Sequence, residues 1–305
     1  MTNISLTKRK DINVIREVIL VDIKQCEDFF PSDDHAFCVF MLSNQAMADL
    51  HGHEFDELVI VRSGSGFHIV NDHAEMIRPG DFFFVTANDV HYYEATSELS
   101  LINILIHRQR AFQYIKNIEP LIASIAEKTR PFNDRYQPLT QQALNSIITL
   151  AEGISHRRDD AFDPLYFSAT ESAFLQILTL LCEGQRACKN AAVDERRKIY
   201  LLDHIRQHYA QEINWKSVCE EGGIALRTLY RFFREMTGST PEKFQQLYRL
   251  LKAQELLRTT DIPVSRIALL CGFLNPPRMT EAYRRYFQHT PSQERQLSTS
   301  IKEKP

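Results

Sequence analysis

The sequence predicts an α+β protein: a small jelly-roll β-barrel in the N-terminal half, helices after it, and an all-α C-terminal half. Short apolar stretches separated by turn residues run from residue 37 to residue 106, as in a barrel of antiparallel strands. Two helices joined by a glycine turn begin near residue 214, and the same pattern returns about 50 residues later. Charge divides the chain at the same place, because residues 1–195 carry 17 Lys and Arg against 28 Asp and Glu, whereas residues 196–296 carry 17 against 10. The basic half can therefore neutralise the phosphates of a nucleic acid, which the acidic half would repel.

Length and composition are sufficient for two ordinary cores, since the chain has 305 residues of which 44% are hydrophobic. We divide it into an N-terminal arm (1–35), the barrel (36–110), a helical dimerisation region with linker (111–190) and the tandem helix-turn-helix domain (197–296). No apolar run reaches the roughly 20 residues of a membrane span, and the first residues lack a signal-peptide pattern, so we expect a cytoplasmic protein. The six cysteines show no C-x-x-C spacing, which suggests neither a zinc site nor a disulfide framework.

In the N-terminal half the strands are expected to be short. The arm has weak periodicity and one short predicted strand, Val18 to Ile23. The predicted barrel strands are Phe37–Leu42, Leu58–Arg62, Phe67–Asn71, Asp81–Thr86, His91–Ala95 and Leu99–Ile106. The turn signals between them are Ser63-Gly64-Ser65-Gly66, Asn71-Asp72-His73 and Arg78-Pro79-Gly80. A barrel of this size has a mouth that holds one small ligand, so we expect this domain to be a sensor.

Four polar residues of the barrel form the candidate effector pocket: His51, His53, Glu57 and His91. The first three stand in the H-x-H-x3-E-x6-G spacing that resembles the first motif of cupins, and His91 resembles the histidine of the second. Alternation along a strand places His51 and His53 on one side, so both can point inward. The second motif departs from the cupin pattern, because Thr86-Ala87-Asn88 stands where cupins prefer P-x-G.

Three interpretations of this pocket remain open. The favoured one is direct hydrogen bonding to a sugar or another polyol. The second is a divalent metal such as iron, manganese, nickel or zinc, for which three histidines and a carboxylate are suitable ligands and which would help to hold the effector. In the third, neighbouring groups satisfy the histidines and the effector binds elsewhere.

Residues 111–190 have helical periodicity. One helix is predicted over Gln141–Ile154, and Asp163-Pro164 begins a second one, with the aspartate as cap and the proline in the first turn. The second helix presents more apolar surface than the face of one barrel needs: Leu165, Phe174, Leu175, Ile177, Leu178 and Leu181-Cys182. This surface fits packing on the barrel and pairing with a second chain.

The C-terminal half contains the helix-turn-helix signal. A short helix begins at Asn214-Trp215, Gly222-Gly223 interrupts it, and a second helix starts at Ala225. In the second helix Leu226, Leu229, Tyr230 and Phe233 form one stripe that we predict to be buried. Arg227 and Arg231 lie on another face, which is free to enter a DNA major groove, where arginine contacts both acceptors of a guanine edge.

The pattern repeats after a long amphipathic segment. Ile267-Ala268, Cys271-Gly272-Phe273 and Thr290-Pro291 correspond to features of the first motif, and Pro241–Arg258 forms a natural connecting helix with Thr240 as its cap. A rigid helix between two recognition helices would place them on successive major-groove segments of one DNA face.

The residues Leu226-Arg227-Thr228-Leu229-Tyr230-Arg231-Phe232-Phe233, Thr237-Gly238 with Pro241, Ile267-Ala268, Cys271-Gly272-Phe273 and Thr290-Pro291 with Arg295 carry a family resemblance. They span about a third of the chain and resemble the AraC/XylS transcription regulators, most closely the rhamnose-responsive members. The resemblance implies that Arg227, Thr228 and Arg231 contact DNA, and that the helices of residues 111–190 pair two sensor domains in a homodimer.

The second recognition helix departs from the family, because it begins with Asn275-Pro276-Pro277-Arg278 where relatives have small polar residues. The two prolines offer no hydrogen-bonding side chain, so Asn275 and Arg278 are its remaining candidates for contacting DNA. We infer that the first recognition helix carries more of the specificity.

These observations together favour a regulator over an enzyme. We expect a ligand-responsive transcription activator of a carbohydrate-use operon, whose partners are promoter DNA, RNA polymerase, a sugar effector and a second copy of the chain. No cofactor is expected unless the barrel holds the divalent metal. The alternatives are a metal-dependent cupin enzyme, such as a sugar isomerase or dioxygenase, fused to a DNA-binding domain, and a regulator whose signal is not a sugar.

Overall fold

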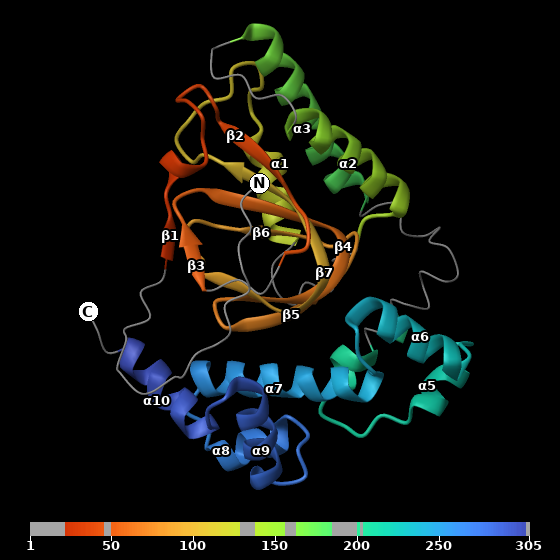
Figure 1. Cartoon of the computed structure of the whole chain (residues 1–305). Coiled ribbons are helices and arrows are strands. Elements are labelled where there is room, and N and C mark those ends of the chain that lie inside the picture. The colour runs from red at the N-terminus through yellow and green to blue at the C-terminus, as the bar shows by residue number, and fades with distance from the viewer. Residues whose placement is uncertain are drawn as a thin grey trace, which may run out of the picture.

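The computed structural model describes residues 22–45, 50–128, 138–155, 163–184, 200–201 and 204–302 (Figure 1). A sheet domain with three covering helices lies on one side and a helical domain on the other, so the predicted α+β class is confirmed. Most of the predicted arm, including the beginning of its strand, lies outside the described residues. The last two residues of that strand form part of β1, Asp22–Lys24.

The sheet domain is built around two long strands. Its strands are β1 Asp22–Lys24, β2 Phe37–Leu42, β3 His51–His53, β4 Asp56–Val70, β5 His73–Ile77, β6 Phe82–Val85 and β7 His91–Ile106, with a 3-10 turn at Cys26–Asp28. The hydrogen-bonded order is β1-β3-β7-β4-β5, with β2 also paired to β7 and β6 to β4. Since this order does not return to its starting strand among the described residues, the sheet of the predicted jelly-roll domain is curled but not closed.

Four of the predicted strands are in fact two. Leu58–Arg62 and Phe67–Asn71 belong to the continuous strand β4, and the two segments predicted between 91 and 106 form β7. The glycine and serine residues at 63–66 therefore form no turn. They lie where the β4–β7 register shifts, and a Cβ at Gly64 (φ +73°) would lie 2.3 Å from the Glu98 carbonyl oxygen. The glycine thus permits a β-bulge that bends both strands.

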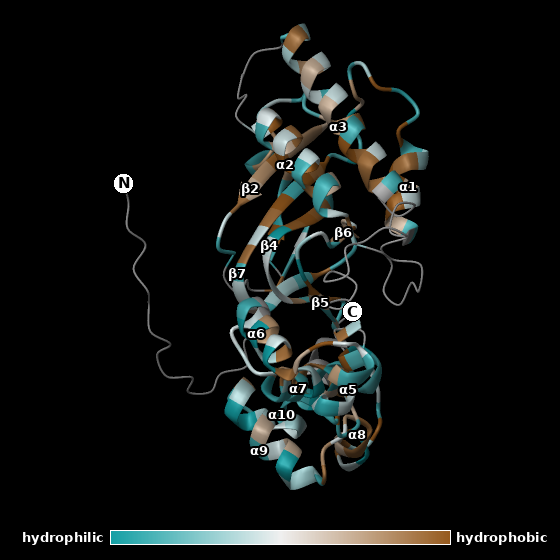
Figure 2. Cartoon of the chain, turned by 90° about the vertical axis from the view of Figure 1, so that its right-hand side faces the viewer, coloured by the Kyte–Doolittle hydropathy of each residue, from teal (hydrophilic) through white to brown (hydrophobic). Residues whose placement is uncertain are grey.

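Three helices cover one face of the sheet: α1 Glu119–Lys128, α2 Gln141–Ser155 and α3 Pro164–Gly184. The predictions for α2 and α3 are confirmed, and the Asp163 carboxylate accepts a hydrogen bond from the Leu165 amide at the start of α3. The apolar strand β2 lies against α2 (Figure 2). The length and apolarity of α3 would suit a membrane span, but Phe174 and Leu178 are fully buried in the core shared with the sheet. Packing against the sheet therefore accounts for part of the apolarity of α3, while Leu165 and Leu175 stay exposed.

The helical domain contains two similar halves joined by one long helix. Its helices are α5 Trp215–Glu221, α6 Leu226–Thr237, α7 Pro241–Thr259, α8 Val264–Leu270, α9 Pro276–Phe287 and α10 Pro291–Lys302. As predicted, Thr240 caps α7 and Pro241 occupies its first turn. Gly238 after α6 and Gln288 after α9 both adopt the left-handed conformation, with φ of 65° and 67°. Two helix-turn-helix units, α5–α6 and α8–α9, therefore lie at opposite ends of α7 (Figure 1).

The sheet domain and the helical domain share one hydrophobic cluster. Phe67 of β4 stacks on Phe244 and Tyr248 of α7, with ring centroids 5.4 and 5.6 Å apart. Polar pairs surround this contact: His73–Glu255 at 3.1 Å, Tyr92–Gln254 at 3.4 Å, Tyr286–Glu94 at 3.0 Å and Arg258–Asp72 at 2.9 Å. The connecting helix thus also serves as the docking surface for the sheet.

Candidate nucleic-acid interface and buried polar cluster

The first recognition helix, α6, presents its predicted polar face to solvent. Leu229 and Phe233 are fully buried, while Arg227, Thr228 and Arg231 are exposed. These three predicted DNA contacts therefore lie together on one accessible face, available to base edges and phosphates.

The buried stripe of α6 is narrower than predicted. Leu226 lies in the first turn and is 44% exposed, and Tyr230 is only partly buried, although both were predicted to be buried. The position of α6 is set by α5, whose Asn214 side chain accepts hydrogen bonds from the amides of Lys216 and Ser217, both at 3.2 Å. This cap satisfies two backbone donors that would otherwise have no partner at the beginning of α5.

The second recognition helix, α9, repeats α6 at a spacing of 50 residues. Both helices have twelve residues, and Met279 and Tyr283 are fully buried where α6 has Leu229 and Phe233. At the same spacing, Pro277 and Glu281 take the places of Arg227 and Arg231. The second unit therefore has no arginine at the positions of Arg227 and Arg231.

The two predicted contact residues of α9 differ in availability. The Asn275 side-chain oxygen accepts a hydrogen bond from the Arg278 amide at 3.0 Å, so it serves as the helix cap and leaves only its amide nitrogen to donate. Arg278 is exposed at the position that Thr228 occupies in α6.

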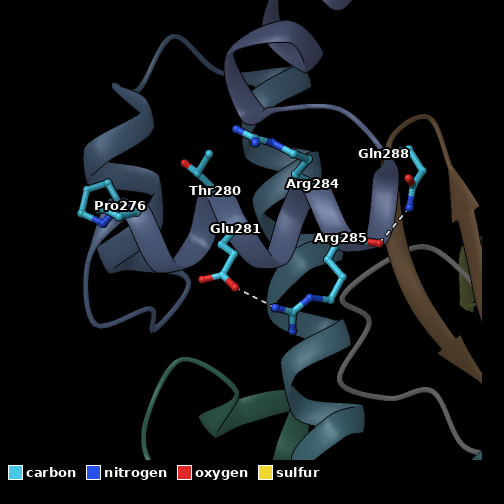
Figure 3. Close-up of a pocket in the computed structure, with 7 residues that line it drawn as sticks. Pro276, Thr280, Glu281, Arg284, Arg285 and Gln288 are labelled. Atoms are coloured by element: carbon cyan, nitrogen blue, oxygen red, sulfur yellow. Dashed lines mark hydrogen bonds and ion pairs between the residues drawn. The ribbon is translucent and has the colours of Figure 1, made fainter. Parts of the chain in front are cut away.

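Two further arginines of α9 were not predicted as contacts. Arg284 and Arg285 line a shallow surface hollow together with Pro276, Pro277, Thr280, Glu281 and Gln288 (Figure 3). Arg285 is held by an ion pair of 2.7 Å to Glu281. Helical spacing places residues 281, 284, 285 and 288 on one face of α9, so the sequence alone could have grouped these two arginines.

The sheet domain contains a buried polar cluster of His53, Glu57 and His91. The Glu57 Oε2 atom lies 3.6 Å from His91 Nε2 and 3.9 Å from His53 Nε2, and one ligand atom from each residue lies within 4.8 Å of the others. The three residues are 3%, 5% and 1% exposed. Within the described part of the chain, these Nε2 and Oε2 atoms make no hydrogen bond.

The other polar atom of each residue has a partner. His53 Nδ1 contacts the Phe55 carbonyl oxygen, which can only accept, so Nδ1 carries the proton and the neutral ring keeps its lone pair on Nε2. The Asn103 amide donates to Glu57 Oε1 at 2.5 Å, and His91 Nδ1 lies 2.9 Å from His68 Nε2. The partners fix the orientation of all three side chains toward a common point.

Burial determines the charge state of this cluster. It raises the pKa of the Glu57 carboxyl to about 7, a rise that the hydrogen bond from Asn103 partly offsets. Burial also lowers the pKa of His53, lowers that of His91 well below its usual range, and lowers that of His68 to about 3. The three imidazoles are consequently neutral near pH 7. The hydrogen bond between His68 and His91 uses one of their two lone pairs, so when His91 Nδ1 donates to His68 Nε2, the lone pairs left for a ligand are those on His53 Nε2 and His91 Nε2.

His51 takes a different place from the one predicted. It is only half-buried and lies outside the group of three converging ligand atoms, although its ring centroid is 4.4 Å from that of His91. Sequence reasoning missed His68 and Asn103, which support the cluster. Asn103 was detectable as the one amide within the apolar segment Leu99–Ile106, but its partner depends on a strand register that the sequence does not determine.

Two family models match separate parts of the chain. Residues 40–166 match the family described as AraC-like ligand binding domain, and residues 218–297 match a helix-turn-helix domain. The HTH-type transcriptional activator RhaS of Salmonella arizonae is 34% identical over 275 residues, which cover 90% of this chain and 97% of that protein. RhaS of Salmonella typhimurium is 32% identical over 274 residues, with the same coverage.

Two solved structures match about a third of the chain. A transcriptional regulator from Chromobacterium violaceum with an AraC-type DNA-binding domain is 26% identical, with a TM-score of 0.33, and covers 34% of this chain and 94% of its own. The DNA-binding domain of AdpA, solved in complex with a target DNA, is 27% identical, with a TM-score of 0.32, and covers 34% of this chain and 95% of its own.

Proposed function

Because the chain belongs to the AraC family of transcription regulators, we propose that it activates carbohydrate-use genes when its sheet domain binds a sugar effector. The similarity to RhaS activators along 90% of the chain supports a sugar of the rhamnose type as this effector. The effector binds on the inner side of the sheet beside His51, which is the accessible member of the predicted pocket, with His53, Glu57 and His91 behind it.

One observation carries the DNA-binding proposal: two recognition helices lie at the ends of a single rigid helix. With 19 residues, α7 is about 28 Å long, which is close to the roughly 34 Å between successive major-groove segments on one face of DNA. Arg227, Thr228 and Arg231 contact bases in the first segment. Asn275 and Arg278 contact the second segment, where fewer base contacts form.

The chain acts as a homodimer that contacts RNA polymerase. Support for pairing comes from α3, whose covered face packs on the sheet while Leu165 and Leu175 remain 74% and 37% exposed. Exposed apolar side chains on a long helix form a contact surface on which the same helix of a second copy packs.

Fluorescence anisotropy with the chain's own upstream DNA, at fixed salt and with a panel of sugars, tests the proposal. We expect an effective sugar to change the affinity for that DNA, and Arg227→Ala to weaken specific binding by about 1 to 3 kcal/mol while random DNA is nearly unaffected. Arg266→Ala, which removes the same charge from the exposed surface of α8, is the matched control. Equal losses on specific and random DNA for Arg227→Ala would refute base contact, and indifference to every sugar would refute the sugar effector.

A further inference from the structure

We propose that His53, Glu57 and His91 bind one divalent transition-metal ion inside the sheet domain. The proposal goes beyond the regulatory function, because it does not depend on DNA binding or on the identity of the effector. It rests on the positions of three ligand atoms, His53 Nε2, Glu57 Oε2 and His91 Nε2.

The spacing of these atoms is close to that of a coordination shell. Metal bonds of about 2.0 to 2.2 Å to imidazole and carboxylate place neighbouring ligand atoms roughly 3.0 to 3.5 Å apart. The distances from Glu57 Oε2 to the two imidazole nitrogens are 3.6 and 3.9 Å. Contraction by a few tenths of an ångström would bring these two distances into that range, and all three ligand atoms already lie within 4.8 Å of one another.

Burial provides an independent argument. Polar atoms that are removed from water normally have a hydrogen-bond partner, and these three atoms have none within the part of the chain that the structure describes. Simple packing does not explain three such atoms converging on one point. A metal ion would satisfy all three at once.

The second polar atom of each ligand is held as it is in metal sites. His53 donates to the Phe55 carbonyl, Glu57 accepts from Asn103, and His91 pairs with His68. Such supporting hydrogen bonds fix the tautomer and the ring orientation of metal-binding histidines. His68 is therefore a positioning residue that leaves the Nε2 atom of His91 free to bind metal.

The ligand set indicates the class of ion. Two imidazoles and one carboxylate suit Zn²⁺, Fe²⁺, Co²⁺, Ni²⁺ or Mn²⁺, whereas Ca²⁺ and Mg²⁺ prefer sites made entirely of oxygen ligands. Three protein ligands also leave coordination positions open to a small molecule. The Tyr93 hydroxyl is also buried without a hydrogen bond among the described residues, and its ring centroid lies 5.1 Å from that of His68 and 6.0 Å from that of His91.

The test uses the full-length protein after removal of metals with a chelator. Co²⁺ is added while its visible absorption is recorded, and Zn²⁺ binding is measured by calorimetry. We expect one equivalent of Co²⁺ to bind with the absorption of a nitrogen- and oxygen-ligated site, and Zn²⁺ to raise the melting temperature. Glu57→Gln, which keeps the side-chain size and the hydrogen bond from Asn103, should weaken binding by about a hundredfold or more and abolish the thermal shift.

A second histidine pair supplies the matched control. His204 and His208 lie one helical turn apart, with ring centroids separated by 4.4 Å, and could capture metal at the surface. The double variant His204→Asn with His208→Asn should retain the full equivalent. Metal binding that survives Glu57→Gln but disappears in this double variant would overturn the proposal, and so would the absence of stoichiometric binding to the stripped wild-type protein. No DNA is present in this test, so its failure leaves the proposed function intact.

Discussion

Phe67 is the residue whose loss should most directly separate the two domains. Its side chain is 1% exposed and lies on the surface of the sheet that faces α7, stacked on Phe244 and Tyr248 with interplanar angles of 19° and 23°. Phe67→Ala removes the ring from this contact without touching the buried polar cluster or the recognition helices. The substitution therefore tests whether the shared hydrophobic cluster couples the domains.

The size of the effect follows from burial. Replacing a core phenylalanine by alanine typically costs about 3 to 5 kcal/mol, and each favourable aromatic pair contributes about 0.5 to 1.5 kcal/mol of that. If about 3 kcal/mol of this falls on docking, the equilibrium between docked and separated domains shifts by roughly 150-fold. A shift of this size is large compared with the polar pairs around the ring, because exposed ion pairs contribute about 0 to 1 kcal/mol each.

Calorimetry combined with tryptophan fluorescence measures the coupling. Trp215 is the sole tryptophan of the chain and packs in the helical domain, so its emission reports the unfolding of that domain. In the wild type we expect its transition to coincide with the calorimetric peak, and in Phe67→Ala we expect two peaks, of which one carries the fluorescence change. Phe82→Ala is the control, because Phe82 is equally buried but packs among the sheet and its covering helices. A single coincident transition in Phe67→Ala, lowered no more than in Phe82→Ala, would refute the reasoning.

Three further predictions concern the helical domain. Burial alone would raise the pKa of Glu294, but the hydrogen bond from His289 and the charge of Arg258 outweigh it and lower the pKa to about 2, so this stabilisation is complete above pH 4.5 and is lost as the pH falls toward 2. The hydrogen bond to Glu294 raises the pKa of His289 above 6.5, so the stabilisation from protonated His289 is complete below pH 6.5 and is lost at higher pH. Urea denaturation measured at several pH values should therefore show maximal stability between about pH 4.5 and 6.5. Glu294→Gln should remove this maximum. Asn214→Ala should destabilise the domain by about 1 kcal/mol in urea unfolding, and a change below about 0.3 kcal/mol would contradict its capping role. Gln288→Gly should stabilise the domain by about 0.5 to 1 kcal/mol, because Gln288 has a φ of 67°, and a loss of stability would show that its hydrogen bond to the Arg285 carbonyl matters more.

The helical domain could be predicted from sequence in detail because its signals are local. Caps and first-turn prolines mark where α7 and α9 begin, and the glycine turn with the apolar spacing marks where α6 begins. The duplicated motif shows the same pattern twice. The sheet was predicted less well, since glycines in the Ser63–Gly66 segment are equally compatible with a turn and with a bulge. The choice between them depends on pairing with residues that lie about 35 positions away in the chain.

The buried cluster shows the same limit. Three of its residues could be selected from spacing, because alternation predicts which side chains share a face of the sheet. The supporting contacts of His68 and Asn103 could not, because each joins strands whose register the sequence does not determine. His51 was predicted to be a ligand because alternation places it on the same face as His53. Alternation does not determine how deeply a side chain is buried.

Strand alternation also explains how a ligand in the sheet domain can affect DNA binding. On β4, His68 faces the buried cluster, whereas its neighbour Phe67 packs on α7. On β7, His91 faces the cluster, whereas its neighbour Tyr92 donates a hydrogen bond to Gln254 of α7. The ligand side and the docking side are therefore opposite faces of the same two strands. A ligand shifts an equilibrium only as far as it binds one arrangement better than the other. A movement of these strands on ligand binding would change the contact with Phe244 directly, and through α7 it would alter the placement of both recognition helices.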